Sequence, residues 1–223
     1  MIAARQIFLG RGAGEPTPPL PYDAEVEYLE STGTQYIDTG ISRDVYSNIG
    51  FMVKLNPLVS ASIDPVVGSF CGYSNWGSRW FGVNYTSRSS RGIQVGLGGS
   101  MAYYSGDMSL RDYDIEVSSV RGVLIDGTQI ESPYGSDVSR SGTSFYLFAT
   151  CARDGSGVNH ISPRRCRIYN LTMYAGADVL EDLIPVRFTN ELGQSEGAMY
   201  DRASGQLFRN AGTGAFLYGP DKS

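Results

Sequence analysis

Short segments of alternating apolar and polar residues, separated by Gly, Asn and Ser, recur along most of this chain. Alternation at every second position puts one set of side chains on each face of a β-strand. Residues 51–55, 92–98 and 113–117 show it clearly. The 28 glycines supply turns, and no long stretch has helical spacing. The pattern predicts an all-β fold of eleven to thirteen strands without an internal repeat.

Two further segments indicate how these strands are arranged. Asp126-Gly127 lies between two apolar runs, and this dipeptide favours a two-residue β-hairpin turn. Residues 145–151 are apolar on both faces, which is typical of a central strand covered on each side. With 223 residues, 41% of them hydrophobic, the chain can bury one large core. We expect a two-sheet antiparallel sandwich.

The first 22 residues differ in character from the rest. A short strand-like piece at residues 4–10 is followed by a stretch rich in Pro and Gly, which forms neither a helix nor a central strand. The sequence predicts an N-terminal arm and linker at residues 1–22 and one domain at residues 23–223. A frayed terminus is the alternative. The residues expected to anchor the arm are Arg5, Ile7, Phe8 and Leu9.

Charge and hydropathy exclude several kinds of partner. The net charge is −5 and the arginines are scattered, which argues against nucleic acid. The short basic cluster at residues 164–167 is interpreted as a solvated sheet edge. The sequence contains no run of about 18 apolar residues, so no membrane insertion is predicted. Residues 1–14 lack the pattern of a secretion signal, so the protein either has lost its signal or leaves the cell by lysis.

The three cysteines, Cys71, Cys151 and Cys166, do not form a disulfide scaffold, because such scaffolds are denser and even in number. Cys151 and Cys166 flank one loop and are expected to be neighbours. A pair of buried thiols is the default interpretation, and a disulfide between them stays open.

The two ends of the expected domain resemble a known family. Residues 28–41 (YLESTGTQYIDTGI) look like the opening strand of concanavalin A-like, laminin-G-like domains of gut bacteria and their phages. Residues 182–188 (DLIPVRF), 197–202 and 204–216 resemble the ending of such domains. The resemblance covers roughly residues 25–220 and implies a jelly roll of two curved sheets. It does not imply one function, because this fold carries lectins, glycosidases, adhesion modules and virion proteins.

Catalysis finds little support in the residues. Some relatives in this fold hydrolyse glucans with a Glu-x-Asp-x-Glu strand, and Asp112, Asp114 and Glu116 match that pattern imperfectly. The residues between them need the core, so any solvent-facing strand would show the same carboxylates. The single histidine, His160, lacks the framework of a catalytic triad. We expect no enzymatic activity.

No cofactor is predicted. The loop that contains Asp154, Ser156 and Asn159 offers oxygen ligands, and the family resemblance leaves calcium open as an alternative. The loop lacks the dense acidic spacing of a calcium site.

Residues 71–85 contain both tryptophans of the chain. Alternation puts Trp80, Gly82 and Asn84 on one face of a strand, and a Trp beside Gly and Asn suits a sugar: a flat ring, open space and an amide. The alternative is that Trp80 covers a second core layer. Tyr73, Asn75 and Trp76 are expected on the adjoining loop. The candidate ligand-binding residues are Tyr73, Asn75, Trp76, Arg79, Trp80, Asn84, Tyr103 and Tyr104.

Two functions are therefore predicted from the sequence. The first is a non-catalytic module on a virion or cell surface that recognises a glycan or another cell-surface polymer. The second is a purely structural virion protein, such as a capsid decoration, fibre or tail appendage. In that case the N-terminal arm would bind other virion proteins or a second copy of the chain.

Overall fold

The computed structural model of the chain describes residues 19–42, 48–58, 68–75, 79–86, 92–98, 100–104, 111–131, 144–151, 158–161 and 165–223, with only the backbone at some strand positions. These residues form nineteen strands and no helix. Within them, accordingly, no helix is long and apolar enough to cross a membrane. The predicted all-β class is confirmed. The predicted anchoring residues of the arm, Arg5, Ile7, Phe8 and Leu9, lie outside the described residues.

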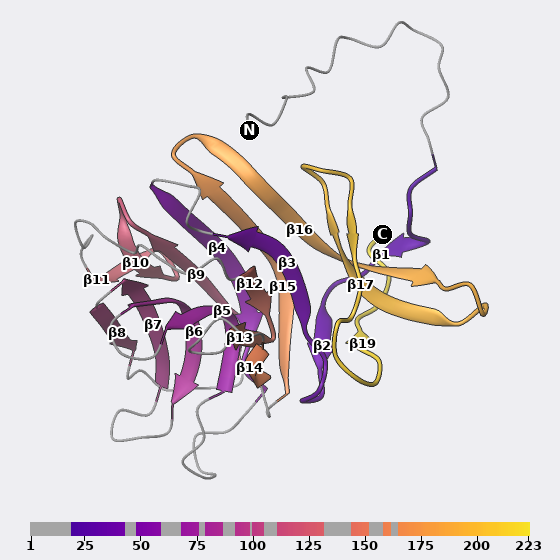
Figure 1. Cartoon of the computed structure of the whole chain (residues 1–223), viewed down its shortest axis with the longest axis horizontal. Coiled ribbons are helices and arrows are strands. Elements are labelled where there is room, and N and C mark those ends of the chain that lie inside the picture. Colours follow the sequence, from indigo (N-terminus) through magenta and orange to yellow (C-terminus); the bar gives the residue numbers. More distant parts are fainter. Residues whose placement is uncertain are drawn as a thin grey trace, which may run out of the picture.

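The larger of the two main sheets has eleven antiparallel strands (Figure 1). Its main path runs through β11 (Thr128–Glu131), β10 (Gly122–Ile125), β9 (Tyr113–Ser118), β4 (Ile49–Asn56), β15 (Cys166–Ala175), β16 (Asp178–Thr189), β17 (Ser195–Asp201) and β18 (Leu207–Phe208). Three short strands complete it: β1 (Ala24–Glu25) pairs with β16, β2 (Leu29–Ser31) with β15, and β19 (Leu217–Tyr218) with β2. The first and last parts of the domain therefore meet beside β15 and β16.

The smaller main sheet has six antiparallel strands. Its order is β3 (Ile37–Ser42), β12 (Ser144–Leu147), β5 (Gly68–Asn75), β6 (Arg79–Thr86), β7 (Gly92–Gly98) and β8 (Ser100–Tyr104). A separate two-stranded pair consists of β13 (Ala149–Cys151) and β14 (Val158–Ile161). The strands outnumber the eleven to thirteen predicted because several are only two to four residues long.

Three phenylalanine rings join the two main sheets. Phe51 of the larger sheet lies edge-on to Phe81 and Phe145 of the smaller sheet, with ring centroids 5.0 and 5.2 Å apart. All three side chains are fully or almost fully buried. They belong to one cluster that also contains the inward-facing residues of β9, Tyr113, Ile115 and Val117. The alternation predicted for residues 51–55 and 113–117 is therefore confirmed, and it fixes which face of each strand is covered.

The predicted hairpin is also present. Asp126 and Gly127 connect β10 to β11 with φ angles of 50° and 75°, as a two-residue hairpin turn requires. The expected central strand at residues 145–151 is interrupted instead. Phe148 has a φ of 61°, and it separates β12 in the smaller sheet from β13 in the two-stranded pair. The residues from Phe145 to Ala149 are nevertheless buried, as their apolar character predicted.

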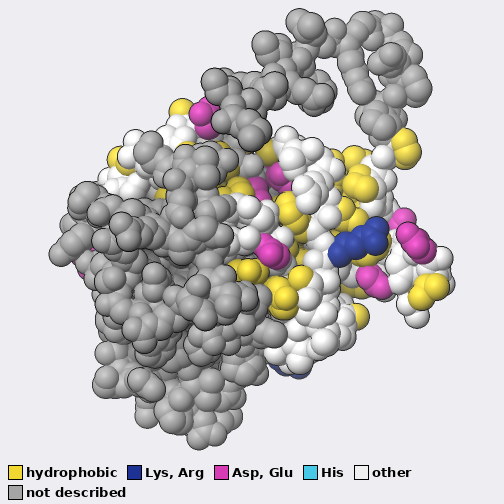
Figure 2. Space-filling model, in the orientation of Figure 1, with side chains coloured by type: hydrophobic (Ala, Val, Ile, Leu, Met, Phe, Trp, Pro, Cys, Tyr) yellow, Lys and Arg dark blue, Asp and Glu magenta, His cyan; other side chains and the backbone are white. Residues whose placement is uncertain are grey.

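The long hairpin of β16 and β17 extends beyond the sandwich (Figure 1). One of its faces contributes to the main core, and the other carries a small second cluster of Ile184, Val186, Phe188 and Ala198. Tyr22 covers this second cluster, its ring 4.9 Å from that of Tyr200. On the face shown in Figure 2, basic and acidic side chains lie close together at this end of the molecule.

Candidate functional site

In the smaller sheet, strand pairing places some of the predicted ligand-binding residues on the face toward the core and others on the outer face. Phe81 and Val83 of β6 are fully buried and define the face that points to the core. Tyr73 pairs with Phe81, and Asn75 pairs with Arg79, two residues before Phe81. Tyr73, Asn75 and Arg79 thus occupy register positions of the core-facing set. Tyr73 and Asn75 also belong to β5, not to the loop on which they were expected.

Tyr104 belongs to the core-facing set as well. It pairs with the fully buried Ile93 and packs against the main core, with its ring 6.3 Å from that of Tyr113. Trp76 lies outside the described residues. Five of the eight predicted residues therefore do not form part of a described outer surface.

The remaining three residues occupy strand positions on the outer face of the smaller sheet. Trp80 and Asn84 alternate with the buried residues of β6, and Asn84 pairs with Gln94, which in turn pairs with Tyr103 of β8. Trp80 pairs with Gly98. At Trp80 and Tyr103 only the backbone is described. The structure therefore brings Trp80, Asn84 and Tyr103 to one face of β6, β7 and β8.

A row of glycines crosses this face. Gly72, Gly82 and Gly96 are directly paired on β5, β6 and β7, and the next residue in the row, on β12, is Tyr146. Glycines have no side chain to rise above the sheet, and they often mark a place where a ligand or another backbone approaches closely. The row lies two residues from both Trp80 and Asn84. Gly82 and Tyr146 of this row are themselves buried.

Asn84 is half-buried, and its Oδ1 atom has no hydrogen-bond donor within the described part of the chain. Buried side-chain oxygens in folded proteins nearly always have a partner, so an unpaired one points to a missing water or ligand. A hydroxyl group near the glycine row would supply the donor. The alternation of residues 79–85 predicted the face of Asn84, but nothing in the sequence indicated its unpaired oxygen.

Two of the three carboxylates considered for glucan cleavage have structural partners. Asp112 accepts a 3.0 Å hydrogen bond from Nδ2 of Asn56. Glu116 accepts one of 3.0 Å from the Tyr174 hydroxyl and forms a 2.9 Å ion pair with Arg121. The outward direction predicted for these side chains is confirmed for the strand β9, whose alternate residues are buried. Cross-strand contacts on the larger sheet thus occupy two of the three groups.

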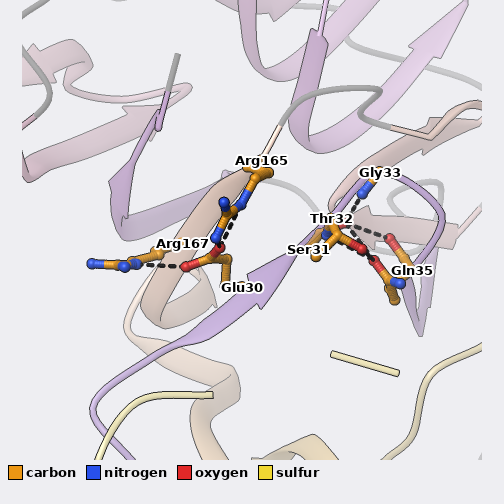
Figure 3. Close-up of polar contacts among 7 residues, drawn as sticks. All are labelled: Glu30, Ser31, Thr32, Gly33, Gln35, Arg165 and Arg167. Atoms are coloured by element: carbon orange, nitrogen blue, oxygen red, sulfur yellow. Dashed lines mark hydrogen bonds and ion pairs between the residues drawn. The ribbon is translucent and has the colours of Figure 1, made fainter. Parts of the chain in front are cut away.

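A buried ion cluster on the larger sheet was not predicted from the sequence. Glu30 of β2 has only 2% of its side chain exposed, and Arg165 and Arg167 both bind it (Figure 3). Arg165 donates to Oε1, and Nε of Arg167 donates to Oε2 at 2.8 Å. The guanidinium of Arg167 also lies over the ring of Tyr28, 4.1 Å from its centroid. Arg167 is paired on both sides, with Glu30 and Asn56, so the interpretation of residues 164–167 as a sheet edge is wrong for Arg167, whereas Arg165 is solvent-exposed as predicted.

Beside this cluster, the family-like opening segment forms a tight turn (Figure 3). Oε1 of the buried Gln35 accepts hydrogen bonds from the backbone N–H of Thr32, at 2.8 Å, and from the hydroxyl of Ser31, at 3.2 Å. Asn210 fastens the same region from the other end of the chain by accepting the Tyr36 N–H. These contacts join residues 31–36 to the C-terminal part of the domain.

Another carboxylate is buried on the inward face of the long hairpin. Glu181 of β16 is 3% exposed, and within the described residues its Oε2 has no hydrogen-bond partner. Burial, reinforced by the charges of Asp201 and Asp38, raises the pKa of Glu181 to about 8. This carboxyl group is therefore mostly protonated at neutral pH.

The described residues hold no group of three or more His, Cys, Asp or Glu side chains that could bind a metal ion. Asp154 and Ser156 of the calcium alternative lie outside them, and His160 and Asn159 are described only as backbone positions in β14. Cys166 is fully buried in β15, whereas the side chain of Cys151 is not described. Calcium therefore stays an alternative to the prediction of no cofactor, and the interpretation of Cys151 and Cys166 as neighbouring thiols stays a prediction.

Comparison with known proteins finds no family model that matches this chain and no curated protein whose sequence matches it. The concanavalin A-like resemblance thus remains a prediction from the sequence.

Proposed function

We propose that this chain is a non-catalytic binding module that recognises a glycan, or another hydroxyl-rich cell-surface polymer, through the outer face of β5, β6, β7 and β8. The module is displayed on a virion or a cell surface, and its two antiparallel sheets form a concanavalin A-like jelly roll. The single observation that supports this function best is the unpaired Oδ1 of Asn84 beside the glycine row.

The chemistry of this face suits a sugar. An amide provides one acceptor and two donors, and sugar hydroxyls can satisfy both kinds. Gly72, Gly82 and Gly96 present only backbone to a flat ring above the sheet. Trp80 lies two residues from Gly82 on the same register, where an indole face could stack on the sugar. Tyr103, paired with Gln94, extends the same face to β8.

The test is binding to an array of bacterial surface glycans by the wild type and by the Asn84→Ala and Trp80→Ala variants. Gln206→Ala is the matched control, because Gln206 is an exposed amide residue at the far end of the larger sheet. We expect the wild type and the control to bind at least one glycan, and both other variants to bind it at least about tenfold more weakly, because Asn84→Ala loses about one hydrogen bond and Trp80→Ala loses the stacked ring.

Each variant must first unfold at the same denaturant concentration as the wild type, so that weaker binding reports the site and not the fold. Equal affinity of all four proteins would contradict the placement of the site. Absence of binding by the wild type to any surface glycan would overturn the binding function and favour the purely structural virion role.

A further inference from the structure

A second polar surface lies on the opposite side of the sandwich, on the outer face of the larger sheet. It consists of Arg165, Arg167 and Lys54, together with the rings of Tyr28 and Tyr169, and we name it the cationic patch. The backbone register places Arg167 directly between Glu30 of β2 and Asn56 of β4. Arg167, Lys54 and Tyr169 therefore lie on paired strands, which favours a fixed geometry, and Arg165 and Tyr28 directly precede β15 and β2.

The cations of the patch are held in place. Glu30 binds Nε of Arg167 at 2.8 Å, and the stacking on Tyr28 fixes the plane of the guanidinium. Figure 3 shows the terminal nitrogens of Arg167 directed away from Glu30. Lys54 lies over the ring of Tyr169, 5.4 Å from its centroid. A guanidinium held in this way presents its remaining N–H donors as a fork that matches a carboxylate or sulfate group.

The patch gathers three cations on one face, although the whole chain carries a net charge of −5. Glu30 is enclosed by two guanidinium groups, and Lys54 lies 3.7 Å from Asp112. Asp114 pairs with Lys54 between β9 and β4 on the same face, so three cations face three carboxylates. The side chains of the cations are 30% to 58% exposed, and the guanidinium of Arg167, rather than a net charge, is what suits an anionic partner.

The patch also contains an unpaired acceptor. Asn56 is 8% exposed, its Nδ2 donates to Asp112, and its Oδ1 finds no donor among the described residues. Burial and the neighbouring Asp112 raise the pKa of the Tyr169 hydroxyl, which therefore stays protonated beside Asn56 and Arg167. A simple anion would satisfy the cations only. A ligand with hydroxyl groups would also satisfy the amide.

From this juxtaposition of a fixed guanidinium fork with an unpaired amide oxygen, we propose that the cationic patch binds an anionic saccharide, distinct from the glycan bound at Asn84. The acidic group is bound by Arg167 and Arg165, and hydroxyl groups by Asn56 and Asp112. The inference rests on the proposed function in one respect, namely that the ligands of this module are saccharides.

Calorimetric titrations with three oligosaccharides test the proposal: a galacturonate oligomer, a neutral galactose oligomer and a sulfated galactose oligomer. We expect the full chain to bind at least one acidic oligomer and not the neutral one. The affinity should fall as salt is added, because the contacts are charged. Preference between the two acidic oligomers identifies carboxylate or sulfate as the natural group.

Arg167→Gln alone would leave the buried Glu30 with one partner and could unfold the domain. The double variant Arg167→Gln/Glu30→Gln removes both charges together, and Lys54→Met leaves the Glu30 cluster untouched. We expect either to weaken acidic-oligomer binding at least about tenfold. Asn84→Ala should leave that binding unchanged and weaken only the binding of the glycan identified on the array.

The outcomes separate the two proposals. Failure of all acidic oligomers to bind, or equal binding by the wild type and the Lys54→Met and double variants, overturns the cationic patch and leaves the site at Asn84 standing. Loss of acidic-oligomer binding in Asn84→Ala alone also overturns the patch, because it would assign every saccharide to the smaller sheet. Failure of the array experiment at Asn84 would contradict only the proposed function and leave the cationic patch standing.

Discussion

The ring of Tyr174 rests on the backbone of Gly50 in the neighbouring strand, so that a Cβ atom added at Gly50 would lie 2.5 Å from its Cζ. These residues are paired directly between β15 and β4. The glycine allows the ring to lie across the sheet and its hydroxyl to donate to Glu116 at 3.0 Å. Gly50 is therefore needed for its lack of a side chain, since its φ is not in the left-handed region.

Gly50→Ala should consequently destabilise the domain by about 1–3 kcal/mol, because the methyl group displaces the Tyr174 ring. Urea unfolding measures the change. In a Tyr174→Ala background the same substitution should cost much less, since the ring is gone, and a double-mutant cycle isolates the coupling. An equal cost of Gly50→Ala in both backgrounds would show that the contact does not determine the choice of glycine.

The buried Glu181 should make stability depend on pH in a direction opposite to that of a salt-bridged carboxylate. Its pKa is about 8 in the folded chain, against an ordinary value of 4.5. The folded state therefore holds a proton that the unfolded state releases. Its contribution to stability is full below about pH 4.5, declines as the pH rises, and is lost above about pH 8.

Glu181→Gln removes this dependence, because the amide cannot ionise. We expect the variant to gain stability relative to the wild type as the pH rises from 5 to 9. The gain is on the order of a few kcal/mol, since a tenfold change in proton affinity corresponds to about 1.4 kcal/mol. Urea unfolding across this pH range measures it. Glu191→Gln, at an exposed turn, is the control, and parallel stability curves for all three proteins would refute the prediction.

The sequence predicted those strands that have one buried face and one solvent-exposed face. Phe51, Val53 and Leu55 show that pattern, and the Asp126-Gly127 turn follows from local backbone preferences. In β5 the residues from Gly68 to Ser74 give no such alternation, and a bulge shifts the register after Ser69. The prediction that Tyr73 and Asn75 lie on a loop is therefore wrong, because both belong to β5.

The candidate sites depended on contacts that a local pattern cannot reveal. Arg165 and Glu30 are 135 residues apart, and only the pairing of β2 with β15 brings them together. The unpaired oxygens of Asn56 and Asn84 are likewise a property of what surrounds them in the fold. The sequence indicated which face Asn84 occupies, because alternation in β6 is a local signal.

Asp201 organises the turn between β17 and β18, and its loss should be costly. Its Oδ1 accepts the backbone N–H of Asp182 at 2.7 Å and of Ala203 at 3.0 Å, and its Oδ2 accepts the N–H of Ser204 at 3.0 Å. Asp201→Asn replaces one acceptor with an NH2 group that faces a donor. We therefore expect Asp201→Asn to destabilise the domain about as much as Asp201→Ala, by about 2–4 kcal/mol.

Thermal and urea unfolding of both Asp201 variants measure this effect. Ser204→Ala serves as the comparison, because it removes a side-chain donor to the same carboxylate and keeps the backbone N–H. It should cost less than either substitution of Asp201. Wild-type stability of Asp201→Asn would mean that the turn needs only a residue of this size and not two acceptor oxygens.

Truncation from the N-terminus should separate an anchoring segment from the folded domain at a position between residues 18 and 26. Asp23 donates its backbone N–H to Arg187, Val26 donates to Pro185 and is fully buried, and Tyr22 packs on Tyr200. Removal of residues 1–18 leaves all these contacts intact and should not change the unfolding midpoint. Removal of residues 1–26 exposes the second cluster and should cost about 3 kcal/mol or more.

The same two truncations test the predicted anchoring by Arg5, Ile7, Phe8 and Leu9, because native mass measurement reports assembly independently of stability. If these residues bind another virion protein or a second copy of the chain, the shorter truncation should lose that association while it stays folded. An assembly that is unchanged without residues 1–18 would assign the contact to the folded domain. An unfolding midpoint lowered by the shorter truncation would place part of the stabilising packing before residue 19.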